Sequence, residues 1–265
     1  MTDAARVTVE VDGGVADVRL ARPEKRNALD PAMFEALVRT GERLRTEPGL
    51  RAVVLSGAGR DFCAGLDLGA MRALGSGDRL TAAVDVPPGD GPAKALGQRA
   101  AYVWAQVPVV AAVHGNALGG GLQIALGADI RIVAPDAVLS VMEVRWGLVP
   151  DMTGTQLLPR LVGPDTAREL VFTGRRVLGT EAAAIGLATR TADDPLAAAF
   201  ALAREIAERS PDAVRAAKRL LDLADRVDLR TGFAAEQTEI AALIGTPNQA
   251  EAVAAGLAKR PPNFS

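Results

Sequence analysis

Apolar and polar residues alternate in two short stretches at the start of the chain, 7–11 and 16–20, on either side of Asp12-Gly13-Gly14. A period of two with a glycine turn between the stretches predicts an antiparallel hairpin. From Asp30-Pro31 the apolar residues fall at helical spacing instead, and Pro48-Gly49 ends that run. The start of the chain therefore predicts a hairpin followed by a helix.

Two continuous apolar runs, 52–55 and 109–113, predict buried strands. A helix is expected at about 93–105, and short strands are expected at 130–133 and 138–142. Strand, strand and helix thus recur along the chain, without sequence identity between the units. This order predicts an α/β fold in which β-β-α units coil into a spiral.

Beyond residue 195 the apolar spacing becomes purely helical and rich in alanine. The expected helices lie at 196–209, 211–226, 229–244 and 249–259. Their apolar faces are broad enough to need a partner, and folding over the chain's own core is one way to cover them. The sequence therefore divides into a core, 1–194, and a C-terminal helical region, 195–265.

The segment 69–95 interrupts the regular pattern. It is rich in Gly, Pro, Asp and Ala and includes Pro87-Pro88-Gly89-Asp90-Gly91. Because long irregular segments of compact domains commonly border binding sites, we expect a partly mobile segment that flanks a pocket, and not a linker between domains.

The composition fits a soluble enzyme. Of 265 residues, 49% are hydrophobic and 23% are charged, which is enough for a core and far from a disordered profile. The net charge of −2 gives no basic field for nucleic acid. A single cysteine, Cys63, excludes an internal disulfide framework, and neither a signal peptide nor a membrane-spanning apolar run is evident. We therefore expect a cytoplasmic location.

Glycines crowd the stretch after the strand at 109–113, and three of them, Gly119 to Gly121, are consecutive. Bare N–H groups at a helix start, together with the helix dipole, suit an anion or an oxygen that becomes negative during a reaction. Phosphate-loop patterns do not fit, because Leu122-Gln123 stands where a P-loop has Lys-Ser/Thr, and Ile124 breaks the dinucleotide fingerprint. A tight strand-to-helix turn without a ligand is the alternative.

A second stretch, Arg60 to Leu68, has the same character. It follows the strand at 52–55 and again places small residues just before an expected helical turn. Two such sites can supply N–H groups to one carbonyl oxygen, which is the arrangement of an oxyanion hole.

With these motifs the sequence resembles the enoyl-CoA hydratase/isomerase (crotonase) superfamily, over nearly the whole chain. The matching stretches are Arg22 to Leu29, Phe62 to Leu68, His114 to Gln123, Glu143 to Gln156, Ser210 to Lys218 and Lys259 to Pro262. The resemblance implies a crotonase-like β-β-α spiral with a C-terminal helical region that assembles a homotrimer or a homohexamer. It also implies an acyl-CoA thioester as substrate, with no further cofactor and no metal.

The resemblance assigns roles to particular residues. The backbone N–H groups of Leu66 and Gly120 occupy the positions of the oxyanion donors, and Glu143 matches a catalytic glutamate. Residues at matching CoA-side or substrate-side positions are Arg22, Lys25, Arg26, Ala64, Asp67, Leu68, Gln123 and Lys259, the last of which would reach a neighbouring subunit. Each charged residue in that set could instead be a solvated surface charge.

The carboxylates depart from the hydratase pattern. Two-glutamate hydratases have a glutamate where this chain has Gln123, and an amide cannot accept a proton at neutral pH. Glu143 follows an apolar strand, where burial would raise its pKa toward neutrality, although a solvated carboxylate at a strand end is the alternative. Asp151 lies eight positions further on, as in the dienoyl-CoA isomerase branch, yet that branch has an aspartate at the position of Gln123. Asp151 could also simply cap a helix.

The sequence thus predicts an enzyme that hydrates or isomerises an unsaturated acyl-CoA through a stabilised enolate, with Glu143 as the main acid and base. Two alternatives remain. One is a dienoyl-CoA isomerase-like shift that uses Glu143 with Asp151, and the other is a catalytically silent acyl-CoA-binding trimer. His114 and Cys63 are expected to be packing residues, because no partner marks either as a nucleophile or a metal ligand.

Overall fold

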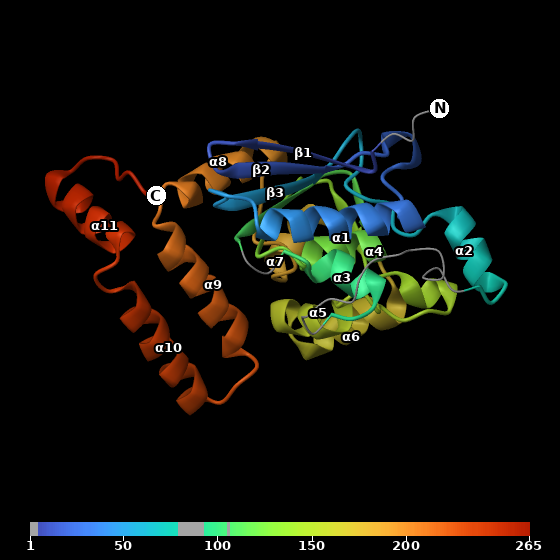
Figure 1. The fold of residues 1–265 in the computed structure, drawn as a ribbon. Coiled ribbons are helices and arrows are strands. Elements are labelled where there is room, and N and C mark those ends of the chain that lie inside the picture. The colour runs from blue at the N-terminus through green and yellow to red at the C-terminus, as the bar shows by residue number, and fades with distance from the viewer. Residues whose placement is uncertain (1–4, 79–92, 105–106) are drawn as a thin grey trace.

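The computed structural model describes residues 5–78, 93–104 and 107–265 (Figure 1). Most of the segment expected to be partly mobile, residues 79–92, lies outside the described residues. The part that precedes it forms a helix, α2 (Leu68–Gly75).

Six strands of the described chain form the central sheet, in the order β1-β2-β3-β4-β6-β9. Their bounds are β1 Val7–Asp12, β2 Val15–Leu20, β3 Ala52–Gly57, β4 Val109–Val113, β6 Ile130–Val133 and β9 Arg190–Thr191. The β1–β2 pair is antiparallel, which confirms the predicted hairpin, and every later pair is parallel. Parallel neighbours bring the carboxyl ends of β3 and β4 to the same edge of the sheet, where the two glycine-containing stretches begin.

Helices cover both faces of this sheet, as the parallel strands require. On one face lies α8 (Pro195–Ala207), whose Ala199 and Ala203 pack against the side chains of Val54 and Ala112. On the other face lie α1 (Pro31–Arg45), α3 (Leu96–Tyr102) and α4 (Gly120–Leu126). The expected helix at 93–105 is thus shorter in the structure.

Helix α1 shows why the local sequence prediction succeeds. The Asp30 side chain accepts a hydrogen bond from the Met33 N–H at 2.8 Å, and Pro31 occupies the first helical turn. Both features stabilise a helix start, because they satisfy or remove N–H groups that have no partner within the helix. The helix then buries one apolar stripe against the sheet, comprising Met33, Phe34, Leu37, Val38 and Leu44.

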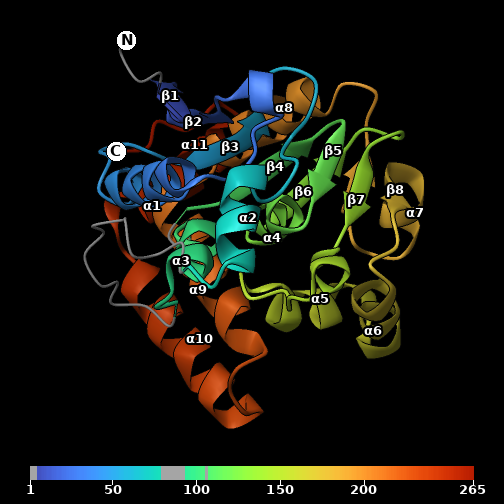
Figure 2. The same ribbon diagram turned by 90° about the vertical axis from the view of Figure 1, so that its right-hand side faces the viewer.

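A smaller sheet of three strands stands beside the first, in the order β5 (Asn116–Leu118), β7 (Val138–Ser140) and β8 (Val177–Leu178). Helices α5 (Gly154–Val162), α6 (Pro164–Thr173) and α7 (Gly179–Ala184) follow along the chain on that side of the molecule (Figure 2). The sequence predicted a strand as far as residue 142, but β7 ends at Ser140. A short 3-10 helix, η3 (Glu143–Trp146), follows it, so Glu143 begins a helical turn.

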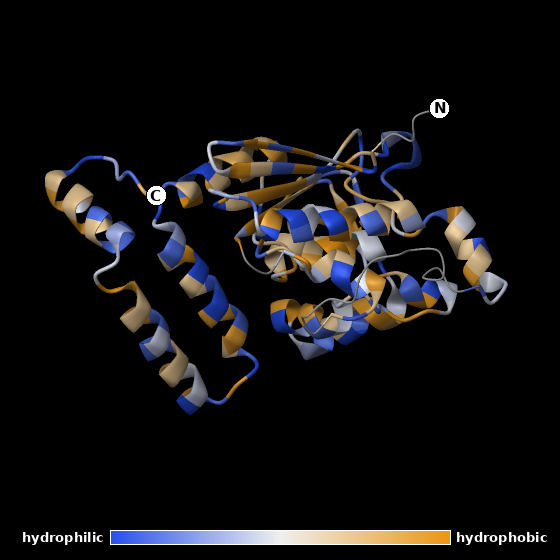
Figure 3. Cartoon of the chain, viewed as in Figure 1, coloured by the Kyte–Doolittle hydropathy of each residue, from blue (hydrophilic) through white to orange (hydrophobic). Residues whose placement is uncertain are grey.

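The last three helices, α9 (Pro211–Ala224), α10 (Leu229–Leu243) and α11 (Pro247–Ala258), extend to the end of the molecule opposite α2 (Figure 1). Helix α8 packs on the sheet, whereas α9, α10 and α11 project from the core. Hydrophobic residues occur along the projecting helices (Figure 3). The exposed large apolar side chains of this part include Leu229, Phe233, Ile240, Ile244, Val253 and Leu257. In the described residues, no helix combines the length and the apolar character needed to cross a membrane.

Candidate active site

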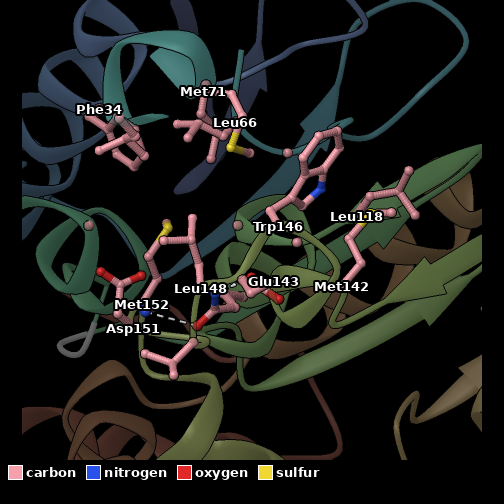
Figure 4. A pocket seen from close by; sticks show the side chains of 18 of the residues that line it. Phe34, Leu66, Met71, Leu118, Met142, Glu143, Trp146, Leu148, Asp151 and Met152 are labelled. Carbon is pink, nitrogen blue, oxygen red and sulfur yellow. Dashed lines mark hydrogen bonds between the residues drawn. The ribbon is translucent and has the colours of Figure 1, made fainter. Parts of the chain in front are cut away.

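A cavity of about 530 Å³ opens where the β3–α2 loop, the β5–α4 turn, the start of α3 and the η3–α5 segment meet. Figure 4 shows Phe34, Leu66 and Met71 on one side of it, facing Glu143 and Met152 on the other. Its polar side chains among the described residues are Gln123, Glu143 and Asp151. The wall is otherwise apolar, with Leu29, Leu68, Leu74, Leu96, Leu118, Met142, Trp146, Leu148 and Val149.

Both candidate oxyanion donors line this cavity. Gly120 is the first residue of α4, so its N–H has no acceptor within the helix, and Gly119 before it has a φ of 52° that favours glycine. Leu66 lies beside Leu29 in a parallel bridge, in which Leu29 bonds to the groups on either side of Leu66. The N–H of Leu66 therefore points away from Leu29.

A network of buried side chains joins the two loops. Asn27 donates to the carbonyl oxygens of Ala58 and Asp61 at 2.9 and 2.8 Å. The Asp61 carboxylate in turn accepts from the N–H of Asn116 at 3.0 Å. Cys63 and Ala117 then pair directly in a parallel bridge. The loop that carries Leu66 and the turn that carries Gly120 are thereby held side by side, through Asp61 and Asn116, which sequence reasoning did not single out.

Glu143 is buried, with 9% of its surface exposed, and its two carboxylate oxygens have different surroundings. Oε1 accepts a hydrogen bond of 2.6 Å from Nε2 of Gln123, whereas Oε2 is buried without a partner among the described residues. Burial raises the pKa of this carboxyl, and the negative charge of Asp151 adds to the rise, against the opposing hydrogen bonds from the Glu143 N–H and Gln123. The carboxyl of Glu143 also lies close to Gly119. A Cβ atom added to this glycine would be 3.5 Å from Glu143 Oε1, which is an ordinary van der Waals distance. A buried carboxyl thus lies beside the turn that carries the Gly120 N–H.

Gln123 is almost fully buried, and its amide bonds to three groups. Its oxygen accepts from the N–H groups of Met152 and Gly154, at 2.9 Å in each case, and its nitrogen donates to Glu143. A backbone N–H can only donate, so the amide oxygen must face Met152 and Gly154, and its orientation is unambiguous.

Asp151 is exposed and lines the cavity. The residue at the cap position of α5 is Thr153, and no side chain caps that helix. The structure thus gives Asp151 no capping role, and it leaves the carboxylate at the cavity.

Of the remaining expected ligand residues, Ala64 and Leu68 line the cavity, and the charged residues do not. Arg22 is instead paired with Asp67 at 2.8 Å, and the pKa of Asp67 is lowered because hydrogen bonds from the Gly69 N–H and Arg22 outweigh its partial burial. Arg26 lies 3.6 Å from Asp61, and Lys25 is exposed beside it. Lys259 is the C-cap residue of α11, a helix that lies at the end of the molecule opposite α2 (Figure 1).

His114 and Cys63 are used structurally. The Nε2 atom of His114 lies 2.9 Å from the carbonyl oxygen of Gly59. The Cys63 thiol donates to the carbonyl oxygen of Asn27 at 3.0 Å, and burial raises its pKa to about 12, which leaves it protonated at neutral pH. Among residues 5–78, 93–104 and 107–265, no three His, Cys, Asp or Glu side chains group as a metal site.

The chain is similar to known proteins along its length. The sequence profile of a family described as enoyl-CoA hydratase/isomerase matches residues 10–265. Human enoyl-CoA hydratase domain-containing protein 2, a mitochondrial protein, is 37% identical over 260 residues, which are 96% of this chain and 86% of the human protein.

Solved structures agree in fold. The crystal structure of an enoyl-CoA hydratase from Bacillus anthracis is 32% identical and has a TM-score of 0.86, with 98% of both chains covered. That of an enoyl-CoA hydratase from Mycobacterium tuberculosis H37Rv is 28% identical and has a TM-score of 0.85, covering 98% of this chain and 99% of the other.

Proposed function

Because the chain belongs to the enoyl-CoA hydratase/isomerase family, we propose that it moves a double bond within an unsaturated acyl-CoA thioester, with Glu143 as the acid and base. The family membership makes the chain an enzyme of the hydratase/isomerase type, and the predicted crotonase fold is confirmed by the matching structures. The observation that carries the choice of isomerisation is the pairing of Glu143 with Gln123 in the apolar cavity.

The proposed step begins with a 3-enoyl thioester. Glu143 Oε2 removes a proton from C2, and the C–H electron pair forms an enolate whose charge rests on the thioester oxygen. The same carboxyl then returns the proton at C4 and leaves a 2-enoyl thioester. The N–H groups of Leu66 and Gly120 would stabilise the enolate oxygen, and such donors typically contribute about 10²–10³ each in rate.

Hydration is disfavoured by the same geometry. Adding water to a 2-enoyl thioester requires groups that accept hydrogen bonds from the water and remove its proton. A carbonyl oxygen has two lone pairs, and those of Gln123 are engaged by Met152 and Gly154. Glu143 is then the only carboxylate buried in the cavity among the described residues.

A second candidate is a dienoyl-CoA isomerase-like shift. It is favoured by Asp151, which lines the same cavity and whose charge reaches Glu143. Two carboxylates at one conjugated system could remove a proton at one end and return it at the other. In that case both 3,5-dienoyl turnover and its loss in Asp151→Asn are expected.

The test compares 3-enoyl, 2-enoyl and 3,5-dienoyl thioesters by ultraviolet absorbance, in heavy water, with mass spectrometry of the acyl group. We expect conversion of the 3-enoyl thioester with deuterium entering the acyl chain. Glu143→Gln should lower kcat/KM by about 10³ or more, because it removes the proton-transfer group. Glu208→Gln, at an exposed glutamate after α8, is the control and should retain activity.

Three results would contradict the proposal. Efficient hydration of the 2-enoyl thioester would restore the hydratase assignment, and wild-type activity in Glu143→Gln would remove Glu143 from the mechanism. Binding of thioesters without turnover or deuterium exchange would identify a silent binding protein.

A further inference from the structure

Gln123 connects two parts of the site that are distant in sequence. Its nitrogen donates to Glu143 on η3, and its oxygen accepts from the turn before α5, through the N–H groups of Met152 and Gly154. The side chain is 1% exposed and lies on the cavity wall. One amide thus holds both the acid–base group and a segment of the acyl cavity.

The turn before α5 depends on this support. Thr153 has a φ of 82°, in the left-handed region that non-glycine residues rarely adopt. Gly154 approaches so closely that a Cβ there would lie 2.8 Å from the Gln123 oxygen. The flanking N–H groups would be buried and unpaired without that oxygen, because Met152 and Gly154 are both buried. Met152 in turn packs against Gly97 and Gly120, so the turn shapes the wall next to a candidate oxyanion donor.

The chemistry of the amide explains its place beside Glu143. An amide can accept two backbone hydrogen bonds and still donate to a carboxylate. A glutamate at position 123 could accept the same two bonds, but its second oxygen would then meet Glu143 Oε1 where an N–H now lies at 2.6 Å. Two such oxygens can stay together only by sharing a proton.

We propose that Gln123 is a positioning residue that fixes Glu143 with Oε2 toward the substrate and, through Met152, sets the adjoining cavity wall. This inference rests on the proposed function, since it assumes that Glu143 transfers the proton. It adds that the reaction type depends on a neutral donor at position 123. Gln123 itself exchanges no proton.

The charged surroundings of Glu143 define the measurement. Asp151, from the segment before α5, is the ionisable group whose charge reaches it. Arg145 on η3 itself packs against Gly174. On α6, which packs against η3, Glu169 is paired with Arg175 at 2.6 Å. The variants used below keep Asp151, so the charge that acts on Glu143 from this residue is the same in all of them.

The test uses Gln123→Met and Gln123→Glu in the full-length protein. The carboxyl of Glu143 is titrated by infrared difference spectroscopy, with Glu143→Gln identifying its band, and kcat/KM for a 3-enoyl thioester is measured against pH. Gln123→Met removes the donor and the acceptor, while Gln123→Glu keeps an acceptor for the two N–H groups. Gln156→Met and Gln156→Glu, at an exposed residue of α5, are the matched controls.

We expect the Glu143 titration to move to higher pH in both Gln123 variants, because each removes the N–H that stabilises the carboxylate. Isomerisation should fall by about a hundredfold in Gln123→Met, since the base loses its fixed orientation. The melting temperature should fall in Gln123→Met and much less in Gln123→Glu. The Gln156 variants should leave the titration and the rate unchanged.

A purely structural role predicts a different result. The titration of Gln123→Met, or its kcat/KM at high pH, would then stay at the wild-type value, and either outcome would overturn the inference. If Gln123→Met does not fold, Gln123→Glu decides through kcat/KM measured above its Glu143 titration, because its added charge moves that titration in any case. A wild-type kcat/KM there would overturn the inference. Because the infrared titration needs no turnover, a wild-type protein without isomerase activity would reject the proposed function and leave the positioning test intact.

Discussion

At the scale of single residues, Glu143 is in an environment that opposes its charge. Burial and the neighbouring Asp151 raise the pKa of its carboxyl, whereas its own N–H and Gln123 hold the ionised form in place. A carboxylate with a raised pKa binds protons more strongly, which suits a group that must both remove and return one. In the proposed reaction, the same environment would make the activity sensitive to pH.

We expect kcat/KM to fall as pH decreases, because Glu143 must be ionised to act as a base. Since the pKa is raised above the ordinary 4.5, the fall should begin at higher pH than for an exposed glutamate. Asp151→Asn removes a negative charge, so it should move the pH at which kcat/KM falls, the acidic limb of the pH profile, to a lower value, as measured with a 3-enoyl thioester. Asp136→Asn, at an exposed aspartate before β7, should not move it. An unmoved limb in Asp151→Asn would show that the two carboxylates do not interact.

At the scale of elements, α2 positions the loop that carries Leu66. Asp67 follows Leu66 directly, and its carboxylate accepts from the Gly69 N–H at 2.7 Å, which caps the helix. The other carboxylate oxygen accepts from Arg22 at 2.8 Å. Arg22 is expected to contact the CoA moiety, and in the structure its guanidinium holds the loop that carries Leu66 and Asp67.

Asp67→Ala should destabilise the protein by about 1–2 kcal/mol, since it removes a helix cap and a charged hydrogen bond. It should also lower kcat/KM, because the Leu66 N–H loses its fixed direction. Urea unfolding and steady-state kinetics measure the two effects. Asp194→Ala is the control, because Asp194 caps α8 through the Ala197 N–H at 2.9 Å, away from the cavity. Equal losses of activity in the two variants would exclude a specific role for Asp67.

The elements also show how far local sequence can predict a fold. The hairpin and helix α1 were recognisable because each repeats its apolar residues at its own period, and the buried strands β3 and β4 because their apolar residues are continuous. Strands β8 and β9, of two residues each, were not predicted, since two residues carry no period. The strand predicted to residue 142 ends at Ser140 because the chain turns into η3, which places Glu143 in the cavity.

At the scale of the whole molecule, α9 to α11 are tied to the core at few points. Lys218 of α9 pairs with Asp129, and Arg51 donates to the carbonyl oxygen of Phe264, beyond α11, at 2.9 Å. Between these contacts α10 has no buried residue, and Phe233 and Ile244 are 58% and 68% exposed. An apolar surface of this kind favours association with other copies of the chain.

We expect a homotrimer, or a hexamer made of two trimers, in analytical ultracentrifugation. Phe233→Asp combined with Ile244→Asp should shift the distribution toward monomer, because a charge in an apolar interface is costly. Leu178→Asp, at a similarly exposed residue on β8, is the control and should leave the assembly unchanged. A wild-type monomer at micromolar concentration would refute the assembly, and with it the expectation that Lys259 reaches a neighbouring subunit.

The sequence by itself determined the hairpin, the buried strands, α1, the C-terminal helices, the family and most of the candidate site residues, because periods, apolar runs and motifs are local properties of the chain. Only the tertiary structure decided what those residues do to one another. Gln123 forms hydrogen bonds with residues 20, 29 and 31 positions away in the sequence, and Asn27 bonds to Asp61, which is 34 positions away. Which distant groups meet depends on how the elements pack, so the motif that marked Gln123 as a departure could not reveal that its amide orients Glu143 and supports the cavity wall.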